Sequence, residues 1–335
     1  MNDTYRKLLD GNNLTSKEMY MLMEDIFDGK LSDIQTASIL TALKIKGETS
    51  QEIIGGATFM RDRAVPFENE LDSFDPVGTG GDGIHSINIS TGTAFIAAAA
   101  GIRVIKHGNR SVSSKSGSAD VLQSLGMDLT TTKENMKMAL EETGMSFLFA
   151  PLYHQSMKEV AAVRKSMGVR TIFNILGPLS NPGKANHMLL GVYDKRLMDN
   201  MADALIKMGC KRAFIVHGME DGADEISIIG KTRVVEVENG RIKEYEIFPE
   251  NFGLKRASLE DIKGGDPDEN KQLLVDALSG KERGAKRDIL LLNAGAALFI
   301  NGKTENITEG VKLAAKLIDE GAVLKTLNSF IERVK

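Results

Sequence analysis

The sequence predicts an α/β protein in which a small all-helical domain is followed by a larger α/β domain with a mostly parallel sheet. Two observations lead to this fold class. The first 65 residues carry three helix-start signatures in series, and from Phe74 onward short β-type runs alternate with helical runs. Such alternation is typical of parallel sheets with helices on both faces. A chain of 335 residues is long enough for one large domain or two smaller ones.

Residues 1–68 are expected to form the helical domain. Three times a Ser or Thr is followed three positions later by Glu or Gln, the capping-box pattern of a helix start: Thr15 with Glu18, Ser32 with Gln35, and Thr49 with Glu52. Behind the first box apolar side chains recur at helical spacing, at Met19, Leu22, Met23 and Ile26. Two glycines are natural helix ends, Gly29 and Gly47.

Residues 69–157 and 186–335 are expected to form the α/β domain. The β-type runs cover 103–108, 145–151, 187–193, 212–218, 226–230 and 233–240. The helical runs cover 91–101, 118–126, 133–144, 196–209, 282–300 and 307–321. Residues 226–247 read as an antiparallel meander that joins the sheet. Residues 158–185 interrupt the alternation, because a helical start gives way to Gly, Pro and Asn. This pattern predicts that the chain returns to the helical domain in residues 158–185 or forms a hinge there.

The composition argues against several classes of function. The net charge of −4 gives no general attraction to nucleic acid. The longest apolar stretch, residues 93–102, is too short to span a bilayer. Cys210 is the single cysteine, so no intrachain disulfide can form, which favours a reducing compartment. The first residues have no apolar signal core. The sequence therefore predicts a cytoplasmic protein that binds neither membrane nor nucleic acid.

A glycine-rich stretch, DPVGTGGDGIHSINIST, covers residues 75–91. Glycines let backbone N–H groups approach an anion and adopt positive φ. The helix expected to begin after Thr91, with Ser90 or Thr91 near its cap, would favour a phosphate at its positive end. No Lys follows the glycines and no GxGxxG is present, so neither a Walker A motif nor a dinucleotide fingerprint fits. The alternative interpretation is an ordinary strand-to-helix turn.

A second loop rich in hydroxyl groups, KHGNRSVSSKSGSADVLQSLG, covers residues 106–126. Lys106, Arg110 and Lys115 supply positive charge, and Ser118 or Ala119 opens the next helix. Two such loops, each at a helix start, indicate a ligand with two separated phosphate groups. His107 is a candidate general base, although a loop histidine is more often a structural hydrogen bonder.

Two further positions have side chains suited to ligand binding. Asp224 and Glu225 follow a glycine turn and precede a β-type run. Their hard oxygens suit Mg²⁺ and would leave positions open for water and phosphate; the alternative is an exposed acidic turn. Arg164 offers a planar fork to a carboxylate; the alternative is a surface or salt-bridge residue.

These motifs together resemble the anthranilate phosphoribosyltransferase family. The resemblance rests on GTGGDG…NIST, KHGNRSVSSKSGSADVLQSLG, RKSMGVRTIFNILGPLSNP and the Asp-Glu pair after a glycine turn. They occur in the family's order and spacing and cover the chain to about residue 330. The resemblance implies a role in tryptophan biosynthesis. It also implies a helical domain hinged to an α/β domain, with a homodimer formed through the helical parts.

The resemblance also implies the roles of individual residues. Anthranilate would be held by Gly78, Asn109 and Arg164. Magnesium, expected as two ions, would be held by Ser90, Asp224 and Glu225. The donor, 5-phosphoribosyl 1-pyrophosphate (PRPP), would be bound by Gly78, Gly81, Asp82, Ser86, Asn88, Ile89, Ser90, Thr91, Lys106, His107, Gly108, Asn109, Arg110, Ser111, Val112, Ser113, Ser114 and Ser118. The two phosphate loops then serve one ligand, with a 5-phosphate at one end and a pyrophosphate at the other.

In the implied reaction the aniline nitrogen attacks C1 of ribose while pyrophosphate leaves, giving N-(5-phosphoribosyl)anthranilate with inversion. No catalytic nucleophile is expected, because charge neutralisation and in-line positioning supply the catalysis. Two alternatives stay open. A pyrimidine-nucleoside phosphorylase-type enzyme would use phosphate and need no metal pair. A non-catalytic, nucleic-acid-binding relative would need a broad basic face.

Overall fold

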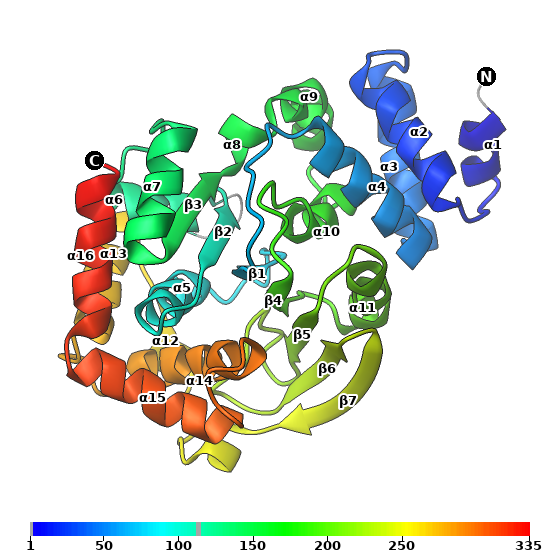
Figure 1. The fold of residues 1–335 in the computed structure, drawn as a ribbon. Helices are drawn as coiled ribbons and strands as arrows, with labels where there is room; N and C mark the ends of the chain where they lie inside the picture. Colours follow the sequence, from blue (N-terminus) through cyan, green and yellow to red (C-terminus); the bar gives the residue numbers. More distant parts are fainter. Residues whose placement is uncertain (1–2, 112–114) are drawn as a thin grey trace.

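The structure, a computed structural model, describes residues 3–111 and 115–335. One seven-stranded sheet is flanked by helices, and a group of N-terminal helices lies at one end of the molecule (Figure 1). The first described residues and the C-terminus lie on opposite sides of the molecule (Figure 1). No helix in the described ranges is long and apolar enough to cross a membrane.

The N-terminal segment is helical, as predicted. It consists of α1 (Asp3–Leu9), α2 (Ser16–Phe27), α3 (Asp33–Lys46) and α4 (Ser50–Arg63). All three predicted capping boxes are confirmed: each capping side chain accepts from the amide three residues on, and that residue's side chain bonds back to the capping residue's backbone. Gly47 caps the end of α3 with a φ of 84°, a conformation that glycine adopts without steric cost.

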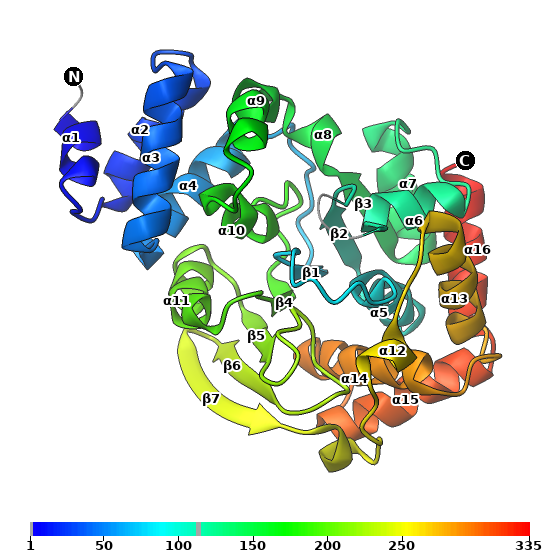
Figure 2. The same cartoon turned by 180° about the vertical axis from the view of Figure 1, so that it is seen from behind.

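Residues 150–179 form α8 (Ala150–Tyr153), the 3₁₀ turn η1 (Gln155–Met157), α9 (Lys158–Met167) and α10 (Ile172–Leu179). Helices α9 and α10 lie between the N-terminal helices and the sheet in both views (Figures 1 and 2). Phe173 of α10 packs on Phe27 of α2, with ring centroids 5.9 Å apart. Helix α10 thus packs against the N-terminal helices, while the domain organisation, with boundaries at 68, 157 and 185, remains a prediction.

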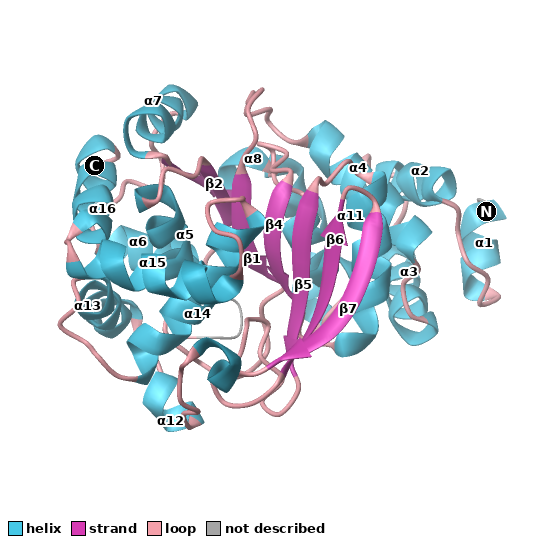
Figure 3. Cartoon of the chain, turned by 60° about the horizontal axis from the view of Figure 1, so that its bottom comes forward, coloured by secondary structure: helices cyan, strands magenta, loops and turns pink. Residues whose placement is uncertain are grey.

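The sheet has the strand order β3-β2-β1-β4-β5-β6-β7, and Figure 3 shows the strands from β2 to β7 in this order. Its strands are β1 (Phe74–Gly78), β2 (Val104–Gly108), β3 (Met145–Phe149), β4 (His187–Gly191), β5 (Arg212–Gly218), β6 (Thr232–Glu238) and β7 (Arg241–Ile247). The pairs among β1 to β5 are parallel, and β6 and β7 join antiparallel. This confirms the mostly parallel sheet and the meander at its end.

The predicted strand at 226–230 is wrong. These residues form no strand and lie in the loop between β5 and β6. Their amides bond to side chains: Ile226 N donates to Asn293 Oδ1 at 2.9 Å, and Ser227 N donates to Thr232 Oγ1 at 2.9 Å. Ile226 and Ile228 are buried, so the apolar run reflects a buried loop, which hydrophobic pattern alone does not distinguish from a strand.

The remaining helices cover the sheet. They are α5 (Ile89–Ala99), α6 (Ser118–Ser124), α7 (Lys133–Thr143), α11 (Met198–Lys207), α12 (Leu259–Ile262), α13 (Pro267–Leu278), α14 (Ala285–Ile300), α15 (Ile307–Asp319) and α16 (Ala322–Arg333). Two 3₁₀ turns accompany them, η2 (Lys195–Leu197) and η3 (Pro249–Phe252). Helices α12, α13 and α16 were not among the predicted elements.

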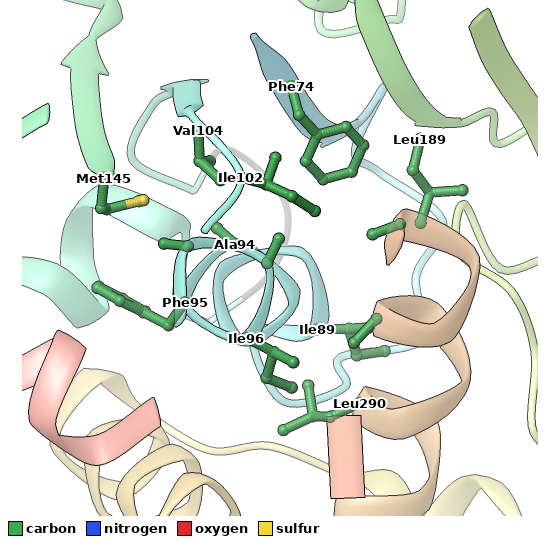
Figure 4. Packing of buried hydrophobic residues seen from close by; sticks show 14 of the residues in the cluster. Phe74, Ile89, Ala94, Phe95, Ile96, Ile102, Val104, Met145, Leu189 and Leu290 are labelled. Carbon is green, nitrogen blue, oxygen red and sulfur yellow. The ribbon is translucent and has the colours of Figure 1, made fainter. Parts of the chain in front are cut away.

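Two apolar clusters form the core, one on each face of the sheet, because strand residues alternate between the faces. Leu189 and Phe214 belong to the cluster around α5 and α14, whereas Leu190 and Ile215 belong to the cluster that includes the N-terminal helices. Figure 4 shows α5 inside the first cluster, among strand residues and Leu290 of α14. A Cβ at Gly92 of α5 would lie 2.7 Å from Leu290 Cδ2, so close packing fixes where the start of α5 lies.

Candidate active site

The candidate site lies at the carboxyl edge of the parallel strands, where loops from β1, β2, β4 and β5 meet. Ligands of open α/β sheets bind at this edge. Thr79 N donates to Gly191 O at 3.0 Å and so joins the ends of β1 and β4. Gly80 N donates to Asp224 Oδ2 at 2.6 Å and joins the β1 loop to the loop after β5. Two motifs separated by more than 140 residues in the sequence are therefore in contact.

The loop after β1 has the backbone that its glycines predict. Gly80, Gly81 and Gly83 have φ values of 70°, 78° and 82°, which only glycine adopts without strain. Asp82 and Ser86 lie in this loop, and Ser86 forms a β-bridge with Lys263. Helix α5 begins at Ile89, with Asn88 in the cap position. The expected start after Thr91 is therefore wrong by about one turn, and Ser90 and Thr91 lie in the first turn of α5.

Not every residue assigned to the donor can use its side chain. The side chain of Ile89 points into the apolar cluster around α5 (Figure 4), so its contribution is limited to the backbone. Thr91 is fully buried, and its Oγ1 has no hydrogen-bond partner among the described residues.

Lys106 lies on β2 beneath the glycine-rich loop, with 2% of its surface exposed. Its Nζ donates to Pro76 O at 2.6 Å and to Ser90 Oγ at 3.1 Å. Burial lowers its pKa, while the carboxylates of Asp75, Glu225 and Asp224 act in the opposite direction. Lys106 is thus the buried cation that faces the acidic side of the site.

His107 is also buried, and its Nδ1 lies 3.3 Å from Gly177 O. Burial, together with the neighbouring His154, lowers its pKa to about 3. The imidazole is therefore neutral at pH 7, and such a low pKa makes it a weak base. The structure favours the hydrogen-bonding interpretation of His107 over that of a general base.

The loop after β2 is described on both sides of a gap. Gly108 ends β2, and Ser118 opens α6 and donates through Oγ to Asn109 O at 3.3 Å. Arg110 pairs with Asp120 at 2.8 Å, and Ser111 N donates to Asp120 Oδ2 at 3.0 Å. The predicted contacts of Val112, Ser113 and Ser114 lie outside the described residues.

Asp224 and Glu225 form an acidic centre beside the glycine-rich loop. Asp224 is 8% exposed, so the alternative of an exposed acidic turn is wrong. Burial raises the pKa of Asp224, and the nearby carboxylate of Asp82 raises it further. Burial and the charge of Asp224 also raise the pKa of Glu225 well above its usual value. The charge of Lys106 and the backbone of Ser90 lower this pKa, but by less.

These groups fit a magnesium site. A divalent cation would stabilise the ionised form of these crowded carboxylates. Their oxygens and the hydroxyl of Ser90 are also the kind of ligand that Mg²⁺ prefers. Among the described residues no group of three or more His, Cys, Asp or Glu side chains is placed to hold a metal ion without other ligands. A magnesium ion here would accordingly keep positions for water or for phosphate oxygens.

Asp75 is a buried residue beside Lys106 and was not among the predicted site residues. It is fully buried in β1, and Asn181 Nδ2 donates to its Oδ2 at 2.7 Å. Burial raises its pKa to about 6, although Lys106 favours the charged form. An aspartate inside a strand is the sequence signal that could have identified it, because an unpaired carboxylate is costly to bury.

Arg164 lies on α9, away from the two phosphate loops in the sequence. Its guanidinium stacks over Phe173 at 5.2 Å, and burial lowers its pKa. The described residues give its guanidinium no ion pair, so the salt-bridge alternative gains no support. Within the described residues no hydrogen bond joins Arg164 to Gly78 or Asn109.

Arg170, three residues past the end of α9, reaches the glycine-rich loop. Its Nη2 donates to Gly81 O, and its guanidinium stacks on Tyr193 at 4.1 Å. The segment between α9 and α10 therefore touches the glycine-rich loop directly, through a residue that the sequence motifs did not indicate.

Comparison with known proteins agrees with this geometry. The glycosyl transferase family model for the helical bundle domain matches residues 2–64, and the model for the a/b domain matches residues 70–324. The anthranilate phosphoribosyltransferase of Acetivibrio thermocellus is 47% identical over 327 residues, which cover 97% of this chain and 94% of that protein. The enzyme of Desulfosudis oleivorans is 49% identical over 333 residues, covering 99% and 98%.

Solved structures give the same result. Anthranilate phosphoribosyltransferase from Thermus thermophilus superposes with a TM-score of 0.94 at 42% identity, covering 99% of each chain. The Saccharomyces cerevisiae enzyme in complex with PRPP and Mg superposes with a TM-score of 0.90 at 31% identity, covering 99% of this chain and 97% of that one. With this fold, these motifs and full-length identity near one half, the chain belongs to the anthranilate phosphoribosyltransferase family of glycosyl transferases.

Proposed function

We propose that this chain transfers the phosphoribosyl group of PRPP to anthranilate at the carboxyl edge of its sheet, as a step of tryptophan biosynthesis. The observation that carries the proposal is the contact of Asp224 with Gly80, which brings a buried acidic centre against a glycine-rich, helix-initiating loop. That combination suits a ligand with a pyrophosphate group and a divalent cation.

The donor would lie between the two loops. Backbone N–H groups of the glycine-rich loop and of the α5 start would face one phosphate group, and the loop after β2 would face the other. Ser90, Asp224 and Glu225 would hold magnesium, for which we propose two ions. Magnesium bound there would neutralise the charge that develops on the leaving pyrophosphate.

The acceptor would enter from the side of α9. Arg164 lies on that helix, half-buried and without an ion-pair partner in the described ranges, so its fork is available for the anthranilate carboxylate. Holding the carboxylate would point the adjacent amine at C1 of ribose, and orientation of this kind contributes much of the rate. We also assign Gly78 and Asn109 to the acceptor.

A homodimer formed by the N-terminal helices belongs to this proposal. Ile34 and Ile45 of α3 are 83% and 80% exposed, and residues eleven apart lie on the same face of a helix. Light scattering of the wild-type chain and of Ile45→Lys would test it, with a monomer expected for the variant. A cytoplasmic location likewise remains a prediction.

The test of the proposed reaction is direct. Protein, Mg²⁺, PRPP and anthranilate are mixed, and the loss of anthranilate fluorescence is followed together with the release of pyrophosphate. Loss of fluorescence that requires both PRPP and Mg²⁺ supports the proposal. Cleavage of pyrimidine nucleosides with phosphate, in place of this activity, would favour the phosphorylase alternative. Retention of a DNA or RNA probe in a gel-shift assay would favour the nucleic-acid-binding one.

A further inference from the structure

Asn88 occupies the cap position of α5 but does not cap the helix. A capping side chain normally accepts from the amide three residues on. Asn306 does so at α15, with a ψ of 168° and a bond of 2.9 Å from Glu309 N. Asn88 instead has φ −74° and ψ 75°, and Ile89 N donates to Ile87 O at 2.8 Å across it. This is an inverse γ-turn.

The consequence is an open amide at the start of α5. The N–H that a capping Asn88 would occupy is that of Thr91, and it has no partner among the described residues. The amide of the next residue is used, since Gly92 N donates to Asn88 O at 3.0 Å. An open amide at a helix start attracts an anion.

Asn270 holds Asn88 in this non-capping position. Asn270 lies in the first turn of α13 and is 1% exposed. Its Nδ2 donates to Asn88 Oδ1 at 2.9 Å, and its Oδ1 accepts from Gly265 N at 2.8 Å. The Asn88 side chain is thereby drawn towards α13, away from the first turn of its own helix.

The same contact links the two phosphate loops. Asn88 Nδ2 donates to Ser116 O at 3.1 Å, so one chain of hydrogen bonds runs from Gly265 through Asn270 and Asn88 to the loop after β2. Residues 262–265 also pair with the end of the glycine-rich loop, since Ile87 N donates to Ile262 O and Gly264 N donates to His85 O. Asn270 is the side chain through which this support reaches Asn88.

We propose that Asn270 is a positioning residue for PRPP: it keeps Asn88 from capping α5, so that the Thr91 amide stays free for a donor phosphate, and it fixes the two loops relative to each other. The inference rests on the proposed function, because it assigns the donor to these loops. Asn270 touches neither substrate in this arrangement and acts through Asn88.

The test measures binding of PRPP with Mg²⁺ by calorimetry, without turnover. Asn270→Ala removes both bonds. Asn270→Asp keeps the volume and the acceptor for Gly265 N, but its carboxylate cannot donate to Asn88 Oδ1. Both variants should bind PRPP about tenfold more weakly, the usual effect of losing one buried hydrogen bond, while the KM for anthranilate changes less than about twofold. Leu278→Ala is the matched control, because Leu278 is fully buried at the far end of α13.

A double-mutant cycle then separates positioning from general destabilisation. If Asn270 acts through Asn88, Asn270→Ala should leave the PRPP affinity unchanged in an Asn88→Ala background. An equal loss in both backgrounds would overturn the inference. The inference would also be overturned if the Asn270 variants behaved like Leu278→Ala, with a lower melting temperature and an unchanged PRPP affinity.

The cycle also distinguishes this inference from the proposed function. Absence of PRPP binding by the wild-type chain would contradict the donor site itself, whereas normal binding by Asn88→Ala would not, because alanine cannot cap α5 and leaves the Thr91 amide free. Weak binding by Asn88→Ala with normal binding by both Asn270 variants would contradict only the role of Asn270.

Discussion

Gly78 and Asp224 meet at the end of β1 so closely that a Cβ at position 78 would lie 2.3 Å from Asp224 Oδ2. The same oxygen accepts from Gly80 N. On the other side of the loop, a Cβ at Gly191 would lie 1.5 Å from Asp224 O. The absence of two side chains therefore lets the acidic loop lie against the strand ends.

Gly78→Ala should displace the carboxylate of Asp224 and impair catalysis. Since Gly78 has an ordinary negative φ, the cause would be the close contact and no backbone strain. We expect at least a tenfold lower kcat/KM, about 1.4 kcal/mol of transition-state stabilisation. A rise in the Mg²⁺ concentration needed for half-maximal activity should accompany it. Wild-type metal dependence in the variant would argue against Asp224 as a ligand.

Asp224→Asn should lower the activity and raise the stability of the metal-free protein. Activity should fall at least tenfold, and the same loss is expected for Glu225→Gln. Burial raises the pKa of Asp224 in the folded state, so the folded chain binds more protons than the unfolded chain between the usual and the raised pKa. The stability of the metal-free protein therefore falls as pH rises through that window.

The amide side chain that Asp224→Asn introduces cannot ionise. The contribution of position 224 to the pH dependence of the free energy of unfolding should therefore vanish. In EDTA at pH 8, Asp224→Asn should be more stable than wild type by at least about 1.4 kcal/mol, the value of one pKa unit. At pH 4 the difference should shrink. Urea denaturation at both pH values measures it, and an equal or lower stability of the variant at pH 8 would contradict the assigned pKa shift.

Lys106→Ala should weaken the use of PRPP much more than that of anthranilate. Its ammonium group bonds Ser90 Oγ and faces the carboxylates of the acidic centre. Because Lys106 is buried, its loss also leaves Asp75 without a counter-charge, so a lower melting temperature is expected as well. Steady-state constants for both substrates test the prediction. An equal rise in both KM values would mean that Lys106 supports the fold alone.

Arg164→Lys should impair anthranilate use, and Arg164→Ala should impair it more. Lysine keeps the charge and loses the planar fork. A charged hydrogen bond contributes roughly 1.5–3 kcal/mol, so a loss of about 10- to 100-fold in kcat/KM for anthranilate is expected, with PRPP affinity nearly unchanged. Equal defects towards both substrates, together with a lower melting temperature, would instead identify a structural residue.

Local signals in the sequence predicted much of this fold. The three capping boxes need only residues three positions apart, and β2, β3, β4 and β5 needed only short apolar runs. The parallel strand β1, which contains Asp75, Pro76 and Gly78, was not among the predicted runs. The error at 226–230 has a physical cause. Its apolar residues are buried as expected, but Asn293, 67 positions further along, takes the amide hydrogen bond that a neighbouring strand would have taken.

The site was predictable where glycines and charged residues lie together in one motif. It was not predictable where the support comes from distant segments. Arg170 reaches Gly81 across 89 positions, and Asn270 reaches Asn88 across 182. The burial of Asp224 was equally hidden, since an Asp-Glu pair after a glycine turn is usually exposed, and the segments that enclose Asp224, at Gly78, Gly80 and Gly191, are distant in the sequence.

The apolar cluster that joins the N-terminal helices to one face of the sheet sets a limit for protein engineering. Phe59 of α4, Ile175 of α10 and Ile215 of β5 all belong to it. A recombinant chain cut near residue 65 would leave part of that face in contact with water and prone to aggregate. Exchange of the helical segment with that of a relative would therefore have to include the facing residues of α10 and α11, so the smallest interchangeable unit is larger than the sequence boundary indicates.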